Sequence, residues 1–415
     1  MPVPHLADAA WLRNGPVARL LALLDGDGEE ARVVGGAVRN ALLWRPVDEI
    51  DVATTAAPSE VVRRVEAAGC KAVPTGIEHG TVTVIVDHHP VEVTTLREDV
   101  ETFGRRARVV FGRDWKADAE RRDFSINALS VAADGRIYDY VGGLADIAAH
   151  RVRFIGEPQR RIEEDFLRIL RFFRFHAHFG AGAPDAAGLL SCIRARSGLE
   201  TLSRERVRME MLKLFVAPRA TPTLAVMAES GLLSMVLGGV AFVADFENMV
   251  KVEAASGTEP DAVRRLGALD VMVREDAERL AQRLRLSNAE AERLSSLEPW
   301  WRIAPQADEQ AARALLYRLG PQAFVDRVLL AWARSDAGAA SVAWHELASL
   351  PRRWTVPAFP LKAADFIARG VAAGPRLGAA LRAAEAAWIG AGFPADAAAL
   401  KAIADVAAHD GAACG

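Results

Sequence analysis

The chain has 415 residues, which predicts two or three domains, and 51% of them are hydrophobic, enough to bury large cores. Its 51 basic and 54 acidic side chains give a net charge of −3, which excludes a global attraction to nucleic acid and leaves only local basic patches. Widely spaced Cys70, Cys192 and Cys414 exclude a disulfide framework, and the lack of a signal peptide or an apolar run of roughly 18 residues predicts a cytoplasmic protein without a membrane span.

The first chemically informative stretch is residues 33–54, which follows an amphipathic helix predicted over residues 16–25. It runs from a strand through two glycines into a short helix, and then into a second strand that carries Glu49 and Asp51. Residues two apart on a strand project to the same side, so these carboxylates can share metal ions. The simpler alternative is a solvated acidic edge strand.

Gly35 and Gly36 precede the helix in this stretch. At the start of a helix, glycines let a phosphate approach the backbone N–H groups at the positive end of the helix dipole. Arg39, one turn further on, is placed to pair with that phosphate. The alternative is an ordinary tight turn, so the order and spacing of glycines, arginine and carboxylates carry the prediction.

A second group of elements follows. Residues 58–69 predict a helix that covers one face of a sheet, with proline in its first turn and glycine at its end. Residues 81–87 and 90–96 alternate as two strands and predict an antiparallel hairpin, with His88 and His89 exposed at its tip. Glu92 alternates with valines on the second strand and therefore faces the opposite side.

Three later segments complete the pattern. Residues 97–118 show no clean period, so a linker is possible, but they hold the basic side chains Arg105, Arg106, Arg108 and Arg113. Asp134 and Gly135 predict a hairpin turn. Residues 160–179 predict one helix, on which an acid and three arginines, Asp165, Arg168, Arg171 and Arg174, share a face; a solvated ion-paired stripe is the alternative. Beyond Pro218 the chain reads as helical throughout.

Five ordered stretches together resemble the class II tRNA nucleotidyltransferases, the family of bacterial CCA-adding enzymes and bacterial poly(A) polymerases. They are residues 33–54, 97–118, 120–129, 163–175 and 202–215. Two positions depart from the family pattern. Asn40 stands where the family usually has aspartate, and Glu49 stands where its first metal-binding aspartate is expected. Asp48 would face the other side of a strand, so Glu49 is aligned with the metal site.

The resemblance implies an α+β fold. Residues 1–148 would form a polymerase-beta-like nucleotidyltransferase head with a mixed sheet, residues 149–217 a helical neck, and residues 218–415 an all-helical, tRNA-binding body and tail. It also implies template-independent addition of CCA to tRNA 3′ ends, using CTP and ATP and releasing pyrophosphate, by a two-metal Mg²⁺ mechanism. The expected partners are the tRNA 3′ end, CTP and ATP, and the oligomeric state stays open between monomer and weak dimer.

The resemblance also assigns roles to individual residues. Glu49 and Asp51 would hold the Mg²⁺ ions, and Glu92 is the candidate for a third carboxylate. The nucleotide-binding set is Gly36, Arg39, Arg121, Arg122, Asp165, Arg168, Arg171 and Arg174. Within it, Gly36, Arg39, Arg121 and Arg122 would contact triphosphate or ribose, Asp165 and Arg168 would read the base, and Arg171 and Arg174 would support them or hold phosphate. Asp123 and Asn127 would brace the loop, and Glu205, Arg206 and Glu210 would orient the base-reading helix.

Four functional alternatives remain at this level. A bacterial poly(A) polymerase shares the same motifs, although it typically adds a basic tail that this chain lacks. A CC-only enzyme is typically shortened within the segment that matches residues 97–118, which is full length here. An A-only enzyme is the third alternative. A catalytically silent RNA-binding paralogue is the fourth, suggested only by Asn40 and Glu49, and glutamate is itself a competent ligand for hard cations.

Overall fold

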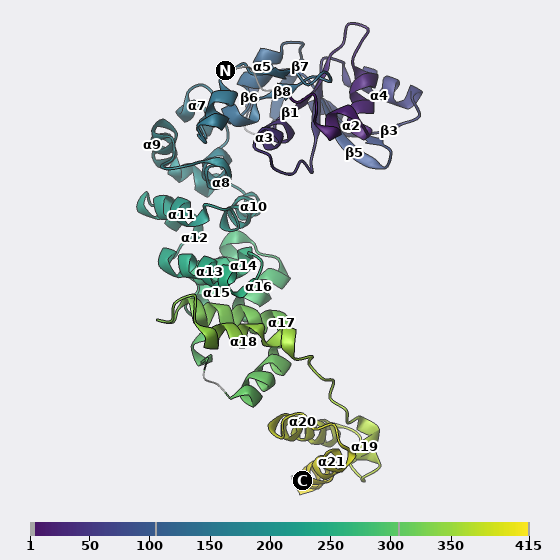
Figure 1. Cartoon of the computed structure of the whole chain (residues 1–415), viewed down its shortest axis with the longest axis vertical. Coiled ribbons are helices and arrows are strands. Elements are labelled where there is room, and N and C mark those ends of the chain that lie inside the picture. The colour runs from purple at the N-terminus through teal and green to yellow at the C-terminus, as the bar shows by residue number, and fades with distance from the viewer. Residues whose placement is uncertain (1–4, 104–105, 306–307, 414–415) are drawn as a thin grey trace. The chain divides into compact units, whose positions relative to one another are not determined.

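The structure is a computed structural model that describes residues 5–103, 106–305 and 308–413 (Figure 1). Contacts divide the chain into two compact units, residues 1–238 and residues 239–415. The finer division that the sequence predicts, at residues 148 and 217, stays a prediction. Within the described residues, no helix combines the length and the apolar character that crossing a membrane requires.

A mixed sheet lies at the centre of the first part of unit 1. Its strands are β1 Ala31–Val34, β2 Asp51–Thr54, β3 Lys71–Gly76, β4 Thr81–Val86, β5 His89–Thr95, β8 Ser130–Val131 and β9 Ile137–Tyr138. Among the described residues they follow the order β3-β4-β5-β2-β1-β8-β9. β1 pairs antiparallel with β2 and β8, whereas β2 pairs parallel with β5. The mixed sheet implied by the resemblance is therefore confirmed.

Two amphipathic helices, α2 (Pro16–Leu24) and α4 (Pro58–Ala67), contact each other and cover one face of the sheet (Figure 1). Both start with proline, whose missing N–H costs nothing in the first turn. Leu20, Leu21 and Val65 are fully buried beneath them. The helices predicted over residues 16–25 and 58–69 are confirmed.

The predicted hairpin over residues 81–96 is also confirmed, because β4 and β5 pair antiparallel. Asp87 and His88 form its two-residue turn with φ values of +49° and +67°, which suits the twist of a tight hairpin. The Asp87 carboxylate accepts a hydrogen bond of 2.9 Å from Arg19 on α2. This contact fixes the hairpin tip to the helical layer.

Residues 97–118 contain regular structure that the sequence did not predict. Strands β6 (Arg97–Phe103) and β7 (Arg106–Phe111) form a separate antiparallel ribbon, followed by helix α5 (Trp115–Glu120). Arg105 lies outside the described residues, as do the side chains of Arg106 and Arg108. Arg113 donates two hydrogen bonds of 2.8 Å to Glu29, so it serves as a structural ion pair.

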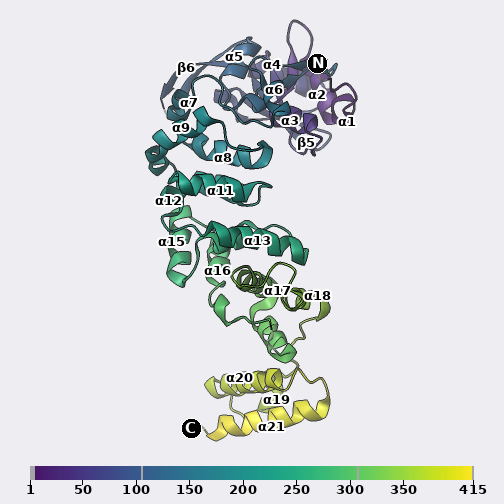
Figure 2. The same ribbon diagram turned by 60° about the vertical axis from the view of Figure 1, so that its left-hand side comes forward.

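The remainder of unit 1 is helical. Its other elements are α1 Ala10–Arg13, α3 Gly36–Leu42, α6 Gly143–Ala148, α7 Pro158–Glu164, α8 Leu167–Phe179, α9 Ala186–Arg194, α10 Arg204–Phe215, α11 Ala220–Glu229, α12 Leu232–Leu237, and the short turns η1 Ile77–His79, η2 Ser125–Asn127 and η3 Arg196–Thr201. α8 packs against α10 and α11, and Figure 2 shows α11 next to α8. The buried ring of Phe124 lies 5.3 Å from that of Phe175 on α8, which fixes this helix beside η2.

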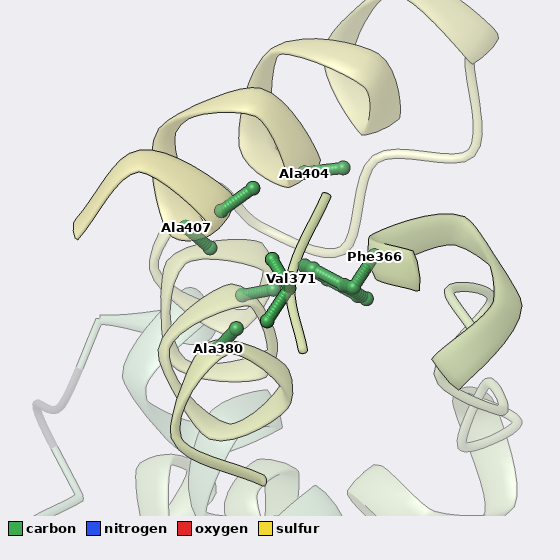
Figure 3. Packing of buried hydrophobic residues seen from close by; sticks show 7 residues of the cluster. Phe366, Val371, Ala380, Ala404 and Ala407 are labelled. Carbon is green, nitrogen blue, oxygen red and sulfur yellow. The ribbon is translucent and has the colours of Figure 1, made fainter. Parts of the chain in front are cut away.

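Unit 2 is helical throughout its described residues. Its elements are α13 Val243–Ser256, α14 Ala262–Asp270, α15 Arg274–Leu284, α16 Asn288–Ser295, η4 Trp300–Arg302, α17 Glu309–Ala333, α18 Val342–Arg353, α19 Ala363–Ile367, α20 Pro375–Gly390 and α21 Ala397–Ala413. The last three pack around Phe366 and Val371, which meet the small side chains of Ala380, Ala404 and Ala407 (Figure 3). Because alanine adds little bulk, these helices approach closely with a small core. The predicted helical C-terminal region is confirmed.

Candidate active site

A cavity of about 700 Å³ in unit 1 gathers side chains from α3, β2, α8, α10 and the segment before η2. Most of the sequence-predicted site residues line it, although they span more than a hundred positions of the chain. They are Gly36, Arg39, Glu49, Asp51, Arg121, Arg122, Asp165, Arg168, Arg171 and Arg174. Glu92 lines a second hollow, which shares Glu49 and Asp51 with the cavity.

The glycine turn between β1 and α3 forms one wall of the cavity. Gly35 has φ +71°, and a Cβ there would lie 3.3 Å from a guanidinium nitrogen of Arg122. The positive φ favours glycine, and any other side chain would also displace the Arg122 guanidinium slightly. The turn brings the start of α3 beside Arg122, on the same side of the sheet as the cavity.

Arg39 reaches the cavity from α3 with its side chain largely buried. Its guanidinium donates to the Asn127 side chain and lies 4.0 Å from the centre of the Phe179 ring. Burial, together with the positive charge of nearby Arg174, lowers the pKa of Arg39 to about 10, so it remains charged at neutral pH.

Asn40, the first departure from the family pattern, is a direct partner of this arginine. Its Oδ1 accepts from Nε and Nη2 of Arg39 at 3.2 and 2.9 Å, and its Nδ2 donates to the Pro46 carbonyl at 3.1 Å. An aspartate could accept from Arg39 but could not donate to the carbonyl when ionised. Compared with aspartate, Asn40 keeps the acceptor for Arg39 and adds a hydrogen bond to the loop before β2. It also removes one negative charge beside Arg39.

Glu49 and Asp51 form the acidic wall of the cavity. The local structure of this wall differs from the prediction at Glu49. β2 begins at Asp51, so the predicted strand carrying both acids is wrong for Glu49, which lies in the irregular segment before it. The preceding run passes through Pro46 and makes no ladder pairing. Both carboxylates nevertheless line the same cavity.

Glu92 lies directly beside Asp51 across the parallel β2–β5 pair. Side chains of paired residues on neighbouring strands share one face of the sheet. Burial, and next the negative charge of Glu92, raise the pKa of Asp51, an effect that Arg122 opposes. Glu92 and Glu49 thus place negative charge near Asp51. Among the described residues, no three acidic, histidine or cysteine side chains lie close enough together to hold a metal ion by themselves.

Arg121 and Arg122 share one buried carboxylate that the sequence analysis did not single out. Asp118, on α5 and only 3% exposed, accepts from Arg121 Nε at 2.8 Å and from Arg122 Nη2 at 3.1 Å. Burial opposes ionisation, but both arginines outweigh it and lower the pKa of Asp118. The spacing of three and four residues on a helical turn is the signal that could have revealed this pairing.

The helix predicted over residues 160–179 is interrupted, so the single continuous helix is wrong. α7 ends at Glu164 and α8 begins at Leu167, with Asp165 between them in an extended conformation. Its Oδ1 accepts the Leu167 N–H at 3.1 Å. A short acidic side chain favours such capping of backbone N–H groups over a position inside a helix.

Asp165 and Arg168 are held by separate partners at the cavity wall. Arg206 on α10 donates to Oδ2 of Asp165 at 2.6 Å. Arg168 donates to Glu164 at 2.5 Å and to the Arg161 carbonyl at 2.7 Å. The orienting function predicted for Arg206 therefore has a geometric basis, whereas the use of Glu164 as a partner was not predicted.

The next two arginines of α8 are paired with acids from distant segments. Arg171 donates to Asp123 at 2.7 Å, and Arg174 forms an ion pair with Glu210 of α10. Burial opposes the charge on Arg171, but Asp123 outweighs it and raises the pKa of Arg171. Asp123 also accepts from Asn127 at 3.2 Å, so the predicted bracing pair is in contact. Lys213, another cavity residue, was not predicted.

Glutamine at position 49 is expected to lower the rate of nucleotide incorporation on the order of a hundredfold, because it removes one charged oxygen donor from the acidic wall. Aspartate at the same position keeps the charge and is expected to retain activity within about tenfold. Steady-state kcat measured across a Mg²⁺ titration checks both variants. Equal activity of Glu49→Gln and the unaltered chain would remove Glu49 from the metal site.

Comparison with known families supports this arrangement. A model described as the poly A polymerase head domain matches residues 31–153, which include the glycine turn, the acidic wall and Arg122. A second, described as a probable RNA and SrmB-binding site of polymerase A, matches residues 191–242.

Similar proteins extend the match along the chain. The mitochondrial CCA tRNA nucleotidyltransferase 1 of Mus musculus is 32% identical over 380 residues, covering 90% of this chain and 86% of that protein. The Danio rerio protein of the same name is 39% identical over 265 residues, 63% of this chain and 61% of that protein. A crystal structure of the Bacillus stearothermophilus CCA-adding enzyme in complex with CTP superposes with a TM-score of 0.70 at 26% identity, covering 91% of this chain and 92% of that one.

The likeness to the mouse protein covers most of both chains. The chain therefore belongs to the CCA tRNA nucleotidyltransferase family, and it is a nucleotidyltransferase.

Proposed function

We propose that this chain completes the 3′ ends of tRNA by adding C, C and A in turn, with CTP and ATP as donors and pyrophosphate as the released product. The observation that carries the proposal is the lining of the cavity, in which an acidic wall and a set of arginines border the same space. Nucleotidyl transfer needs this combination, because the triphosphate is anionic and the reaction requires positioning and charge neutralisation more than covalent help.

The acidic wall would supply carboxylates for Mg²⁺, whose sites are commonly completed by substrate phosphates and water. Glu49 and Asp51, with Glu92 beside Asp51, supply the oxygen donors that Mg²⁺ prefers. Bound Mg²⁺ would lower the charge repulsion between the attacking hydroxyl and the phosphates. In the transfer step, the RNA 3′-hydroxyl gives up its proton to solvent and its oxygen forms a bond to the α-phosphorus. The bond between the α-phosphorus and the bridging oxygen breaks, and pyrophosphate leaves.

The triphosphate would lie between the glycine turn and the arginine pair. Arg122 points at Gly35 and is anchored by Asp118, so its guanidinium is preorganised. Because Gly36 has no side chain, a phosphate could approach the backbone N–H groups at the start of α3. Arg39 adds a positive charge, which its neutral partner Asn40 does not offset. Preorganised cations cost little entropy on binding, which favours tight, oriented phosphate contacts.

Selection of C and A would come from Asp165 and Arg168. A carboxylate accepts the exocyclic amino groups that both cytosine and adenine carry, and a guanidinium donates to their ring nitrogens or carbonyl. Each oxygen of Asp165 already accepts one hydrogen bond, from Leu167 N–H or Arg206, and retains capacity for another. Arg171 and Arg174 would stabilise this arrangement through their ion pairs.

The C-terminal part of the chain would bind the tRNA. We infer a catalytic head at residues 1–148, a base-selecting neck at residues 149–217, and a body and tail at residues 218–415 that hold the tRNA. Support comes from the helical character of the C-terminal region and from a solved relative, a Thermotoga maritima CCA-adding enzyme complexed with tRNA. That structure is 18% identical to this chain and therefore supports the fold alone.

The assay for this proposal uses three tRNA transcripts, which end before CCA, before the final A, or after complete CCA. CTP and ATP are supplied singly and together. We expect CC from CTP alone on the first transcript, a single A from ATP on the second, and no extension of the third.

Each other outcome identifies an alternative and contradicts the proposal. Long A tracts on any transcript indicate a poly(A) polymerase. Arrest after CC with both nucleotides present indicates a CC-only enzyme, and activity only on the second transcript indicates an A-only enzyme. Binding of RNA without any incorporation indicates a silent paralogue.

A further inference from the structure

The loop between α3 and β2, residues 43–50, carries Glu49 but contains no helix or strand. Ladder pairing of the described strands β1 and β2 begins at Asp51, so other contacts hold the backbone before it. Trp44 at the start of the loop has φ +55° and is 96% exposed, so its side chain does not hold the loop by packing. The position of Glu49 therefore depends on hydrogen bonds to neighbouring elements.

Arg45 and Asn40 connect this loop to the helices around the active-site cavity. Arg45 donates to the His178 carbonyl near the end of α8 at 2.8 Å. Asn40 on α3 donates from Nδ2 to the Pro46 carbonyl at 3.1 Å. Its own backbone carbonyl accepts the Arg45 N–H at 2.9 Å. Asn40 thus contacts the loop through both its side chain and its backbone.

The same amide is a partner of Arg39, the arginine assigned to the triphosphate. The Oδ1 of Asn40 accepts from Nη2 of Arg39 at 2.9 Å, and the side chain of Asn127 accepts from Nη1. Both acceptors are neutral, so they orient the guanidinium without cancelling its charge. A phosphate on Arg39 would therefore meet a cation whose position depends on Asn40.

We propose, on the basis of the function proposed above, that Asn40 is a positioning residue that couples the triphosphate site at Arg39 to the loop that carries Glu49. The two bonds need an acceptor and a donor on one short side chain, and the amide of asparagine has both. An ionised aspartate lacks the donor and places negative charge beside Arg39. The two departures from the family pattern, at positions 40 and 49, are thereby connected through the bond to Pro46.

Hydrogen exchange on the free chain tests the bond to the loop without any substrate. Asn40→Asp is expected to speed amide exchange of residues 43–50 about fivefold, the factor that corresponds to the loss of one net hydrogen bond. Asn288→Asp makes the same chemical change at the exposed start of α16 in unit 2, and it is expected to leave this exchange unchanged. Equal exchange of these residues in the two variants would overturn the proposal.

Binding of CTP in the presence of EDTA tests the charge beside Arg39. Asn40→Asp is expected to raise the Kd for CTP about tenfold, because the new carboxylate competes with phosphate for the guanidinium. Asn40→Ala removes both bonds without adding a charge. It is expected to speed exchange of residues 43–50 as much as Asn40→Asp does, but to raise the Kd less. A Kd for CTP that is equal in Asn40→Asp and Asn288→Asp would contradict the assignment.

A measurement on the unaltered full chain avoids any folding defect. Inorganic triphosphate in EDTA is expected to slow exchange of residues 43–50, because a phosphate on Arg39 restrains Asn40 and, through it, the loop. Asn40→Ala is expected to abolish this slowing. If triphosphate leaves the exchange of the unaltered chain unchanged, or slows it equally in both proteins, the coupling is wrong.

A double-mutant cycle with Glu49→Gln tests the metal side of the coupling. Asn40→Asp is expected to raise the Mg²⁺ concentration for half-maximal CMP incorporation about fivefold. In the Glu49→Gln background the carboxylate carried by the loop is already lost, so the same change is expected to have less than about a twofold effect. Equal factors in both backgrounds would overturn the proposal.

Failure of this inference is distinguishable from failure of the proposed function. If the unaltered chain extends tRNA and Asn40→Asp behaves as Asn288→Asp does, only the role of Asn40 is wrong. If the unaltered chain extends no RNA, the proposed function is wrong, and the exchange measurements still test the bond between Asn40 and the loop.

Discussion

Replacement of Asp51 by alanine is expected to reduce nucleotide incorporation roughly a thousandfold or more, with the fold retained. Asp51 stands at the start of β2 and is not one of the fully buried residues of the core, although its carboxylate is partly desolvated. Burial and the negative charge of Glu92 raise the pKa of this carboxyl, and a bound cation would favour its ionised form. Single-turnover incorporation of CMP, together with a thermal unfolding curve, measures both parts of the prediction.

The control for this substitution is Glu66→Ala, which removes an exposed carboxylate from α4 on the covered side of the sheet. It changes the net charge by the same amount but touches neither cavity, so its kcat is expected to match that of the unaltered chain. Incorporation by Asp51→Ala at the rate of Glu66→Ala would exclude the acidic wall from the reaction.

Replacement of Asp326 by alanine is expected to destabilise unit 2 by about 3–5 kcal/mol. Asp326 on α17 is fully buried and accepts from Arg264 at 3.0 Å and from Arg293 Nε at 2.6 Å. Without it, among the described residues, Arg264 keeps only Glu253 and Arg293 keeps only Asp261 as a carboxylate partner, and each guanidinium loses a charge-assisted hydrogen bond in the interior. Thermal unfolding is expected to show a lower Tm for the transition of this unit, by on the order of ten degrees.

An exposed ion pair of the same unit provides the comparison. Glu247 and Lys251 form a contact of 2.8 Å on α13, and both side chains are about half exposed. Glu247→Ala is expected to change the free energy of unfolding by about 0–1 kcal/mol, since solvent screens the pair. A similar loss for Asp326→Ala and Glu247→Ala would show that the buried network contributes little.

Much of the head could be predicted from local patterns. Alternating apolar residues indicate the hairpin over residues 81–96, and an apolar residue every three or four positions indicates the helix over residues 58–69. Such periods can be read from the sequence without knowing what the element packs against. The two-stranded ribbon formed by β6 and β7 could not be predicted in this way, because the sequence of residues 97–111 shows no sustained alternation of apolar and polar residues.

The sequence predicted which residues line the candidate site, but it did not predict which of these side chains pair with one another. The order of motifs collected Arg39, Asp51, Arg122 and Arg171 into one set, and the structure brings these side chains around one cavity. Their partners come from segments far apart in the sequence, such as Glu210 for Arg174, and no local period encodes such pairing. The break at Asp165 was missed because helical spacing continues across it, while the side chain caps the next helix.

The most direct test of the proposed function is the 3′-end sequence of a tRNA transcript lacking CCA after incubation with the full chain, Mg²⁺ and all four nucleoside triphosphates at equal concentration. The account predicts that the products end in CCA and are not extended further, because the proposed base selection by Asp165 and Arg168 would admit only C and A. Products that end in other nucleotides, in long A tracts or in the original terminus would contradict it.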